Sequence, residues 1–153
     1  MNFLIRLIIL LTLSLWLFGI FIEWFIPLVP HFFLLFPFLE KSYSLVCHQQ
    51  QSKLLGETIY HSLVCSRCAG IYVGLFISSL ASLIITNYKE PSQKLIIFAA
   101  IPMLADVFLY SIGAYNYSKY LAFITGLLLG SVVFLYFYSA MKKLIQELNR
   151  KKN

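Results

Sequence analysis

The sequence is poor in charge. Only 12% of its 153 residues are Asp, Glu, Lys or Arg, about half the share found in ordinary soluble domains. In contrast, 60% of the residues are hydrophobic and the mean hydropathy is +0.82. This composition excludes an ordinary soluble domain, so we expect an integral membrane protein.

Linkers, low-complexity segments and heptad repeats are also missing, so we treat residues 1–153 as a single integral membrane domain. A signal-peptide cleavage site is missing as well. Arg6 precedes an apolar run, but this run is longer than a typical signal-peptide core, and residues 21–24 contain no small side chain. We therefore expect the run to remain as an uncleaved helix.

Four apolar windows are long enough to cross a bilayer, which takes about 20 mostly apolar residues for roughly 30 Å of hydrocarbon. These windows lie near residues 7–26, 68–86, 95–112 and 120–140. They predict an all-α membrane protein, a four-transmembrane-helix bundle. A loop between the first two helices would then carry the cysteine and histidine residues.

The segment after the first window is apolar but interrupted by Pro27, Pro30 and Pro37. Proline removes a backbone donor and breaks a helix, so we expect an interfacial or re-entrant segment here and not a fifth span. His31, within this segment, is expected to lie at the interface without a chemical role. Short turns are expected at residues 89–92 and 114–118.

Basic side chains are unevenly distributed. Residues 141–153 form a tail with five Lys or Arg residues, and an excess of basic residues marks the cytoplasmic side. We therefore expect cytoplasmic N- and C-termini, with eight basic residues inside, four outside, and the cysteines outside. The net charge of +6 favours contact with anionic lipids of the bilayer. A nucleic-acid partner is not expected, because the tail is too short to form a folded basic surface.

Small side chains recur every four residues in the second and fourth windows. Such residues let membrane helices approach closely, and the close approach supplies the dispersion contacts that hold them together. We therefore expect these two helices to touch. The small residues concerned are Gly70, Gly74, Ser78 and Ser82 in one window and Ala122, Gly126 and Gly130 in the other.

All three cysteines fall within residues 47–68. Cys65 and Cys68 are spaced i and i+3, so on a helix their side chains share one face. A helix N-terminus and the positive charge of Arg67 would both lower a thiol pKa. Cys47 precedes Cys65 by seventeen intervening residues and is followed directly by His48.

Two chemistries use such a cluster. Zinc or another thiophilic metal ion would take the three thiolates and one imidazole, from His48 or His61, in a tetrahedral shell. Alternatively, the Cys-x-x-Cys pair would cycle between dithiol and disulfide, with Cys47 as a third participating thiol. A third interpretation is a structural disulfide with one cysteine left over.

Two carboxylates fall within or at the end of the predicted spans. Asp106 lies roughly 9 Å below the outer boundary at 1.5 Å per residue, about level with Thr125 and Tyr72. Carboxylates inside a membrane are costly, so Asp106 is a candidate site residue or the ion-pair partner of Arg67. Glu23 can reach the interface and is expected to have a structural role.

The strings "CHQ" and "CSRCAGIYVG", followed by Asp106 and a late "ITGLLLG", resemble the prokaryotic membrane proteins of domain-of-unknown-function family 2085. The resemblance runs from about residue 43 to residue 130. The family has no assigned activity, so the resemblance supports the position of the site and leaves its chemistry open. The residues that fall on the motif are Cys47, His48, Gln49, Cys65, Arg67, Cys68, Gly70, Tyr72 and Gly74.

The chain departs from the family pattern at three positions. Lys53 and Ala122 occur where arginine is usual, and Val107 occurs where glycine is usual. If the arginine that is usual at the position of Ala122 normally balances the charge of the intramembrane acid, Asp106 in this chain depends more on Arg67 or on a metal ion for charge balance, or is protonated.

Overall fold

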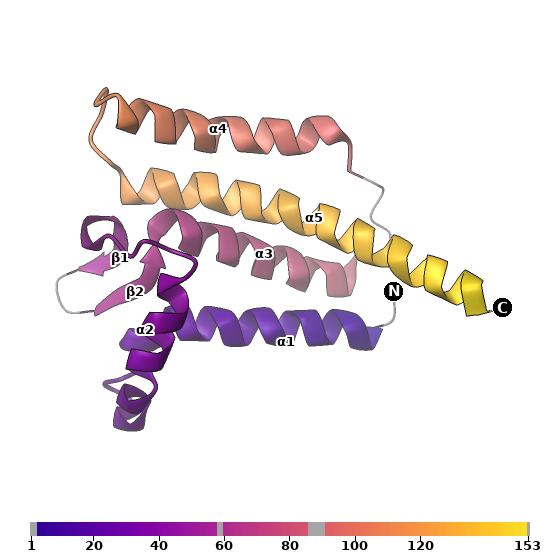
Figure 1. Cartoon of the computed structure of the whole chain (residues 1–153), viewed down its shortest axis with the longest axis horizontal. Coiled ribbons are helices and arrows are strands. Elements are labelled where there is room, and N and C mark those ends of the chain that lie inside the picture. Colours follow the sequence, from indigo (N-terminus) through magenta and orange to yellow (C-terminus); the bar gives the residue numbers. More distant parts are fainter. Residues whose placement is uncertain (1–2, 58–59, 86–90, 153) are drawn as a thin grey trace.

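The computed structural model describes residues 3–57, 60–85 and 91–152. Four of its helices are long and apolar enough to cross a membrane. They lie side by side in the spatial order α4, α5, α3, α1, which confirms the predicted four-helix bundle (Figure 1). Their bounds are α1 Phe3–Ile20, α3 Ser66–Ile84, α4 Gln93–Ser111 and α5 Lys119–Lys152.

The first helix lies earlier in the chain than expected, since α1 ends at Ile20 and not near residue 26. A short 3-10 helix, Ile22–Trp24, follows it. Pro27 accounts for the early end, because its ring would collide with the carbonyl of residue 23 in a continuing α-helix. The apolar run was therefore read correctly as a span, but its last residues belong to the turn that leaves the bundle.

The last helix is longer than the predicted span. At about 1.5 Å per residue, the 34 residues of α5 extend about 51 Å, well beyond the roughly 30 Å of hydrocarbon. Its basic end projects past the rest of the bundle, on the same side as the N-terminal end of α1 (Figure 1).

The proline-interrupted segment does not form a further span. Pro30–Leu34 form a 3-10 helix, and Phe36–Ser44 form the nine-residue helix α2. In Figure 1, α2 runs across the end of the bundle and not along it. This course fits an interfacial segment, and His31 is exposed within it.

The expected loop before the second span contains a β-hairpin, which is a small addition to the otherwise helical architecture that the sequence predicted. Strands β1 (Leu54–Glu57) and β2 (Tyr60–Cys65) pair antiparallel, with Leu54 opposite Cys65. A 3-10 turn, Gln51–Lys53, leads into β1. The register is irregular after Leu54, where Gly56 has a φ of +110°.

Helices α3 and α5 share the most extensive helix contact, and their small residues form it. A Cβ atom on Gly70 or Gly74 would collide with backbone atoms of α5, and one on Gly126 or Gly130 would collide with backbone atoms of α3. Only hydrogen atoms at these positions allow the two backbones to approach so closely.

A second contact joins α1 to α3 at the end of the bundle near the termini. Arg6 is buried there, and its Nη1 donates a hydrogen bond of 3.0 Å to the carbonyl of Ser82.

Two turns were expected between the later spans. Lys89 and Glu90, in the turn expected at residues 89–92, lie outside the described residues, as does Thr86 at the predicted end of the second span. The turn expected at 114–118 does lie between α4 and α5.

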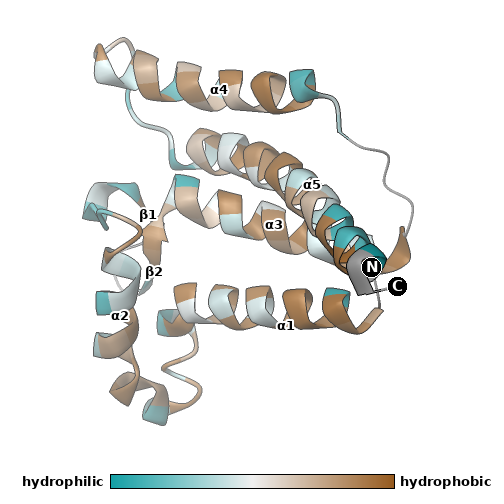
Figure 2. Ribbon diagram, turned by 45° about the vertical axis from the view of Figure 1, so that its right-hand side comes forward, coloured by the Kyte–Doolittle hydropathy of each residue, from teal (hydrophilic) through white to brown (hydrophobic). Residues whose placement is uncertain are grey.

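Many large hydrophobic side chains of the long helices are exposed. The ribbon of these helices is largely hydrophobic, and hydrophilic residues collect at the basic end of α5 (Figure 2). This outward apolar surface is expected of a protein that faces lipid. The buried hydrophobic cluster lies at the opposite end, where α1, α2, β2 and α3 meet. It consists of Ile20, Ile22, Tyr43, Cys47, Leu63, Val64 and Ala69.

Candidate functional site

The three cysteines converge at the hairpin end of the bundle. Cys47 lies just after α2, Cys65 ends β2 and precedes α3, and Cys68 lies in the first turn of α3. Their sulfur atoms all lie within 4.8 Å of one another. Among the described residues, they are the one group of three or more Cys, His, Asp or Glu side chains that converges closely enough to hold a metal ion.

The hairpin explains how Cys65 and Cys47 come together. Strand β2 delivers Cys65 directly to the start of α3, where its extended backbone (φ −62°, ψ 155°) caps the helix. The backbone N–H of Cys65 then donates to the Cys47 sulfur at 3.2 Å. A backbone donor aimed at a sulfur stabilises its thiolate form.

Gln49 holds the loop that carries Cys47. Its backbone adopts the left-handed region, with a φ of +47°. Its side-chain amide donates to the carbonyl of Glu40 at 3.1 Å and to that of Leu63 at 2.9 Å. These bonds join the middle of α2 to β2 and therefore fix the turn that points Cys47 at the other two thiols.

The environment favours one ionised thiol. The pKa of the Cys47 thiol is lowered, first by the hydrogen bond from the Cys65 side chain and then by that from Cys68. The backbone N–H groups of Cys65 and Gln49 act in the same direction, and burial opposes them. The pKa of the Cys65 thiol is raised, chiefly because its hydrogen bond supports the thiolate of Cys47.

The spacing of the sulfurs suits a single ion. Thiolates at about 2.3 Å from a tetrahedral zinc ion stand about 3.8 Å apart, and the 4.8 Å limit on the three sulfurs is close to this. Three soft sulfur donors favour zinc, copper(I) or iron over magnesium or calcium. The residues present therefore fit a thiophilic ion with one remaining coordination position.

Neither histidine joins the three sulfurs in this structure. His48 follows Cys47 directly, but its side chain is exposed. His61 lies on β2, where its backbone N–H donates to Glu23 Oε2 at 2.6 Å and its Nδ1 lies 3.6 Å from the same oxygen. Glu23 therefore ties the end of α1 to the hairpin, which is a structural role.

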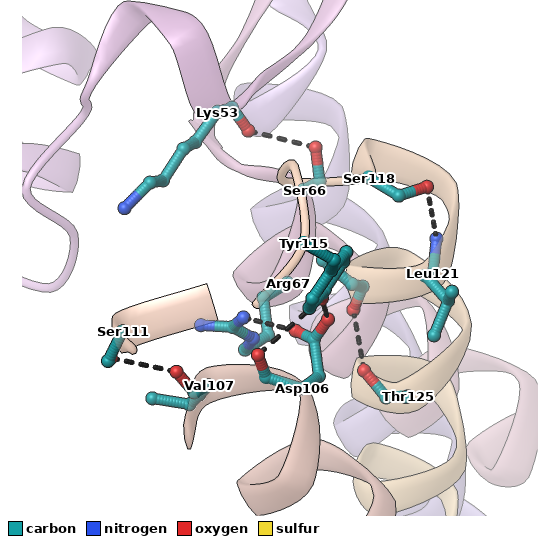
Figure 3. Close-up of polar contacts among 11 residues, drawn as sticks. Lys53, Ser66, Arg67, Asp106, Val107, Ser111, Tyr115, Ser118, Leu121 and Thr125 are labelled. Atoms are coloured by element: carbon teal, nitrogen blue, oxygen red, sulfur yellow. Dashed lines mark hydrogen bonds and ion pairs between the residues drawn. The ribbon is translucent and has the colours of Figure 1, made fainter. Parts of the chain in front are cut away.

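Arg67 lies between Cys65 and Cys68 in the chain but turns toward α4. Its guanidinium pairs with Asp106, and the hydroxyl of Tyr115 donates to the other oxygen of the same carboxylate (Figure 3). The Asp106 side chain is 1% exposed and that of Arg67 is 19% exposed. Arg67 and Asp106 thus form the ion pair that was one of the two roles considered for Asp106.

Thr125 and Tyr72, which were expected near the level of Asp106, and the nearby Tyr110 make packing or hydrogen-bond contacts within the bundle. Thr125 is buried and donates to the carbonyl of Ala122 at 3.2 Å. Tyr72 packs beside Trp16, with ring centres 5.9 Å apart, and against the core that contains Cys47. Tyr110 faces Tyr117 and the ammonium group of Lys53, which lies 4.6 Å from its ring centre.

Sequence reasoning missed two contributors. Tyr115 falls in the turn expected at residues 114–118, and nothing in its local sequence pattern pointed to Asp106 on α4. Gln49 was part of the family motif, but its part in holding the Cys47 loop depends on carbonyls of α2 and β2 that only the fold brings near.

Comparisons with known proteins agree with the membrane architecture. A family model described as "Predicted membrane protein (DUF2085)" matches residues 47–136, which is more than half of the chain and includes all three cysteines. No solved structure matches the chain.

Two archaeal proteins, both described as uncharacterised, are similar in sequence. The one from Methanocaldococcus jannaschii is 34% identical over 101 residues, which span 64% of this chain and 65% of that protein. The one from Methanothermobacter thermautotrophicus is 34% identical over 83 residues, which span 54% of this chain and 75% of that protein.

Proposed function

The chain belongs to the DUF2085 family of predicted membrane proteins, as the sequence motifs indicated, and we propose that it binds one thiophilic metal ion through Cys47, Cys65 and Cys68. The observation that carries this proposal is the approach of the three sulfurs to within 4.8 Å of one another, from the loop after α2 and from the start of α3. Zinc is the proposed ion, because it takes thiolate and imidazole ligands in a tetrahedral shell without further demands on geometry.

The local hydrogen bonds support this assignment. Metal-bound cysteines must be deprotonated, and the backbone N–H of Cys65 already donates to the Cys47 sulfur. Hydrogen bonds to ligand atoms orient them and tune the metal. Gln49 supports the same loop through its two bonds to backbone carbonyls.

His48 is the proposed fourth ligand. It follows Cys47 directly in the chain and its side chain is exposed, so this proposal requires a side-chain rotation or a loop movement that brings its imidazole to the thiols. His61 is the weaker candidate, because it is engaged with Glu23. If the fourth position stays with water, the site has the open coordination that catalytic zinc sites use.

Metal analysis of protein purified in mild detergent tests the proposal. We expect about one zinc equivalent per chain, in line with a single tetrahedral site. Cys68→Ser should lose most of the metal, because a hydroxyl replaces a soft charged ligand. His48→Ala should lower metal affinity and His61→Ala should not, so the two histidine variants serve as a matched pair.

Free-thiol counting belongs beside the metal analysis. Wild-type protein that retains its fold, carries no transition metal and has three reduced thiols would contradict the proposal. Equal metal loss from both histidine variants would instead point to a disturbed hairpin and would remove His48 as the assigned ligand.

A thiol-disulfide oxidoreductase is the second candidate, favoured by the lowered pKa of Cys47. The Cys47 thiolate would attack a substrate disulfide, break its S–S bond and release one substrate thiolate. The thiolate of Cys65 or Cys68 would then attack the Cys47 sulfur of the mixed disulfide and release the second. The substrate would be reduced by two electrons and the protein would be left with an internal disulfide.

The expected orientation is also part of the proposal. The N-terminal end of α1 and the basic end of α5 lie on one side of the bundle, and the hairpin and the start of α3, where the cysteines converge, lie on the other (Figure 1). With the basic end of α5 in the cytoplasm, the cysteine site faces the outside of the cell.

A further inference from the structure

A groove lies beside the hairpin, between the end of α1 and the start of α5. It has a volume of about 830 Å³, within the range of roughly 300–1,000 Å³ that is typical of small-molecule sites. None of the residues proposed as metal ligands lines it. The side chains that define it are Phe21, Trp24, Tyr117, Lys119, Tyr120 and Phe123.

The groove lies at the level where the spans end. Trp24 follows the last turn of α1, and Lys119 and Tyr120 begin α5. Trp24 is 49% exposed and Tyr120 is 80% exposed. Aromatic side chains with a polar edge collect at membrane interfaces, near the lipid head groups, so the groove opens toward the interfacial layer of the bilayer.

Lys119 is the only formally charged residue among the described lining residues, and its charge is positive. Its Nζ makes one long contact of 3.4 Å, to the carbonyl of Gly56. An ammonium group has three donors, so Lys119 can donate to a ligand while it keeps this contact. The start of α5 adds a partial positive charge at the same place.

We propose that this groove binds a phospholipid with an anionic head group. The phosphate lies at Lys119, and one acyl chain lies against the aromatic rings of Phe21 and Phe123. Three features favour this occupant together: an apolar floor, a cationic rim, and an opening at the depth of lipid head groups.

A bound lipid would also cover one wall of the cysteine core. Phe21 and Phe123 line the groove and pack against the buried cluster that includes Cys47. The two sites are nevertheless separable, because the groove takes its charge from Lys119 and the metal site takes its ligands from the thiols.

Trp24 provides a direct reporter. The chain has two tryptophans, so Trp16→Phe leaves Trp24 as the single tryptophan, which is excited selectively at wavelengths that tyrosine does not absorb. This protein is placed in neutral phosphatidylcholine vesicles that contain a small fraction of a brominated lipid, whose acyl chain quenches tryptophan fluorescence on contact. In one sample the brominated lipid is phosphatidylglycerol, and in the other it is phosphatidylcholine with the same brominated chain. We expect phosphatidylglycerol to be enriched about fivefold at the groove, the factor that corresponds to about 1 kcal/mol for one basic side chain.

Three variants in the single-tryptophan background assign the effect. Lys119→Gln should abolish the preference for phosphatidylglycerol, and Lys119→Arg should retain it because the cation is kept. Lys41→Gln is the matched control, since Lys41 is an exposed lysine at the same end of the bundle, on α2, that does not line the groove. Circular dichroism and gel filtration in detergent verify that each variant is folded.

Several results would overturn the proposal. Equal quenching by the two brominated lipids in the Trp16→Phe protein would exclude an anionic preference. A preference that survives in folded Lys119→Gln would exclude Lys119 as its source. Loss of the preference in Lys41→Gln to the same degree would indicate general surface charge and not the groove.

Discussion

Arg67 illustrates how neighbouring residues can serve different sites. It lies between Cys65 and Cys68 in the chain, but the helix turns it away from the sulfurs and toward Asp106 on α4. A buried carboxylate needs such a partner, because an unpaired charge in a low-dielectric interior is costly. The Cys-x-Arg-Cys string therefore combines a ligand pair with the cation that joins α3 to α4.

This pairing predicts a non-additive set of variants. Arg67→Ala should destabilise the protein by about 3–5 kcal/mol, the usual cost when one partner of a buried pair is removed. Asp106→Asn in the same chain should recover part of this loss, because it removes the unpaired charge. Thermal unfolding in detergent of the two single variants and the double variant measures the coupling.

Metal content and thiol reactivity of the same variants separate the two candidate functions. In a metal site the ion itself deprotonates the thiols, so Arg67→Ala should retain the metal. In a redox site the positive charge of Arg67, although it is paired with Asp106, would still act at the start of α3 beside the thiols, so Arg67→Ala should slow thiol alkylation and shift its pH dependence upward. If the effects of the two substitutions on stability are additive, and if thiol alkylation and metal content stay unchanged, Arg67 neither stabilises the fold through Asp106 nor influences the thiols.

Among the elements, the hairpin has the largest influence on the site. It places Cys65 at the start of α3, and it depends on Gly56, whose φ of +110° is rare for residues with a side chain. A Cβ atom there would collide with the carbonyl of Tyr60, the partner of the adjacent residue in β1. Glycine is therefore required at position 56 for two reasons: the positive φ, and the absence of space for a Cβ atom.

Gly113 offers a matched control for this argument. It also has a positive φ, of +71°, but a Cβ atom on it would meet nothing within 4 Å. Gly113→Ala should cost about 1–2 kcal/mol, from the backbone conformation alone. Gly56→Ala should cost clearly more and should also lower metal retention, because the collision displaces β2 and Cys65. Equal losses of thermal stability, with metal retained in both, would contradict the role given to the hairpin.

Helices α3 and α5 present the opposite case, in which an element contact was readable from the sequence. Gly70 and Gly74 meet the backbone of α5, and Gly126 and Gly130 meet that of α3. The four-residue spacing indicated the contact for a physical reason. Lipid supplies no hydrophobic drive between helices, so helices associate through the close packing that small residues on one face allow. The spacing could not indicate that α4 contacts α5 and that α1 contacts α3.

The two ends of the molecule differ along the direction of the long helices. The cysteine site, the hairpin and α2 occupy one end, and the N-terminal end of α1 and the basic end of α5 occupy the other (Figure 1). Topology is therefore a property that one reporter can test for the entire bundle.

We predict that a reporter fused after the C-terminus is active only in the cytoplasm. The physical reason is the excess of Lys and Arg in the last turns of α5, which resists translocation. A membrane-impermeant thiol reagent should label cysteines in intact cells only after metal removal and reduction, since the cysteines are buried or half-buried. A C-terminal reporter that is active only outside the cell would contradict this orientation and would place the cysteines on the cytoplasmic side.

Composition and hydropathy were sufficient to predict a multi-pass membrane protein with four helices, because a bilayer requires each span to be long and apolar whatever its neighbours are. The motif strings were likewise sufficient to indicate the family and to single out the three cysteines. These features are local, so a linear sequence carries them in full.

Only the tertiary structure decided which of these residues meet. The strand signal in Leu54–Glu57 and Tyr60–Cys65 was too short to read, but pairing of the two strands sets the position of Cys65. Likewise, Tyr115 reaches Asp106 and His61 engages Glu23 through contacts between segments that are distant in the chain or joined by a turn. Such contacts depend on how helices pack and where the chain turns back, and side-chain identity alone does not specify either.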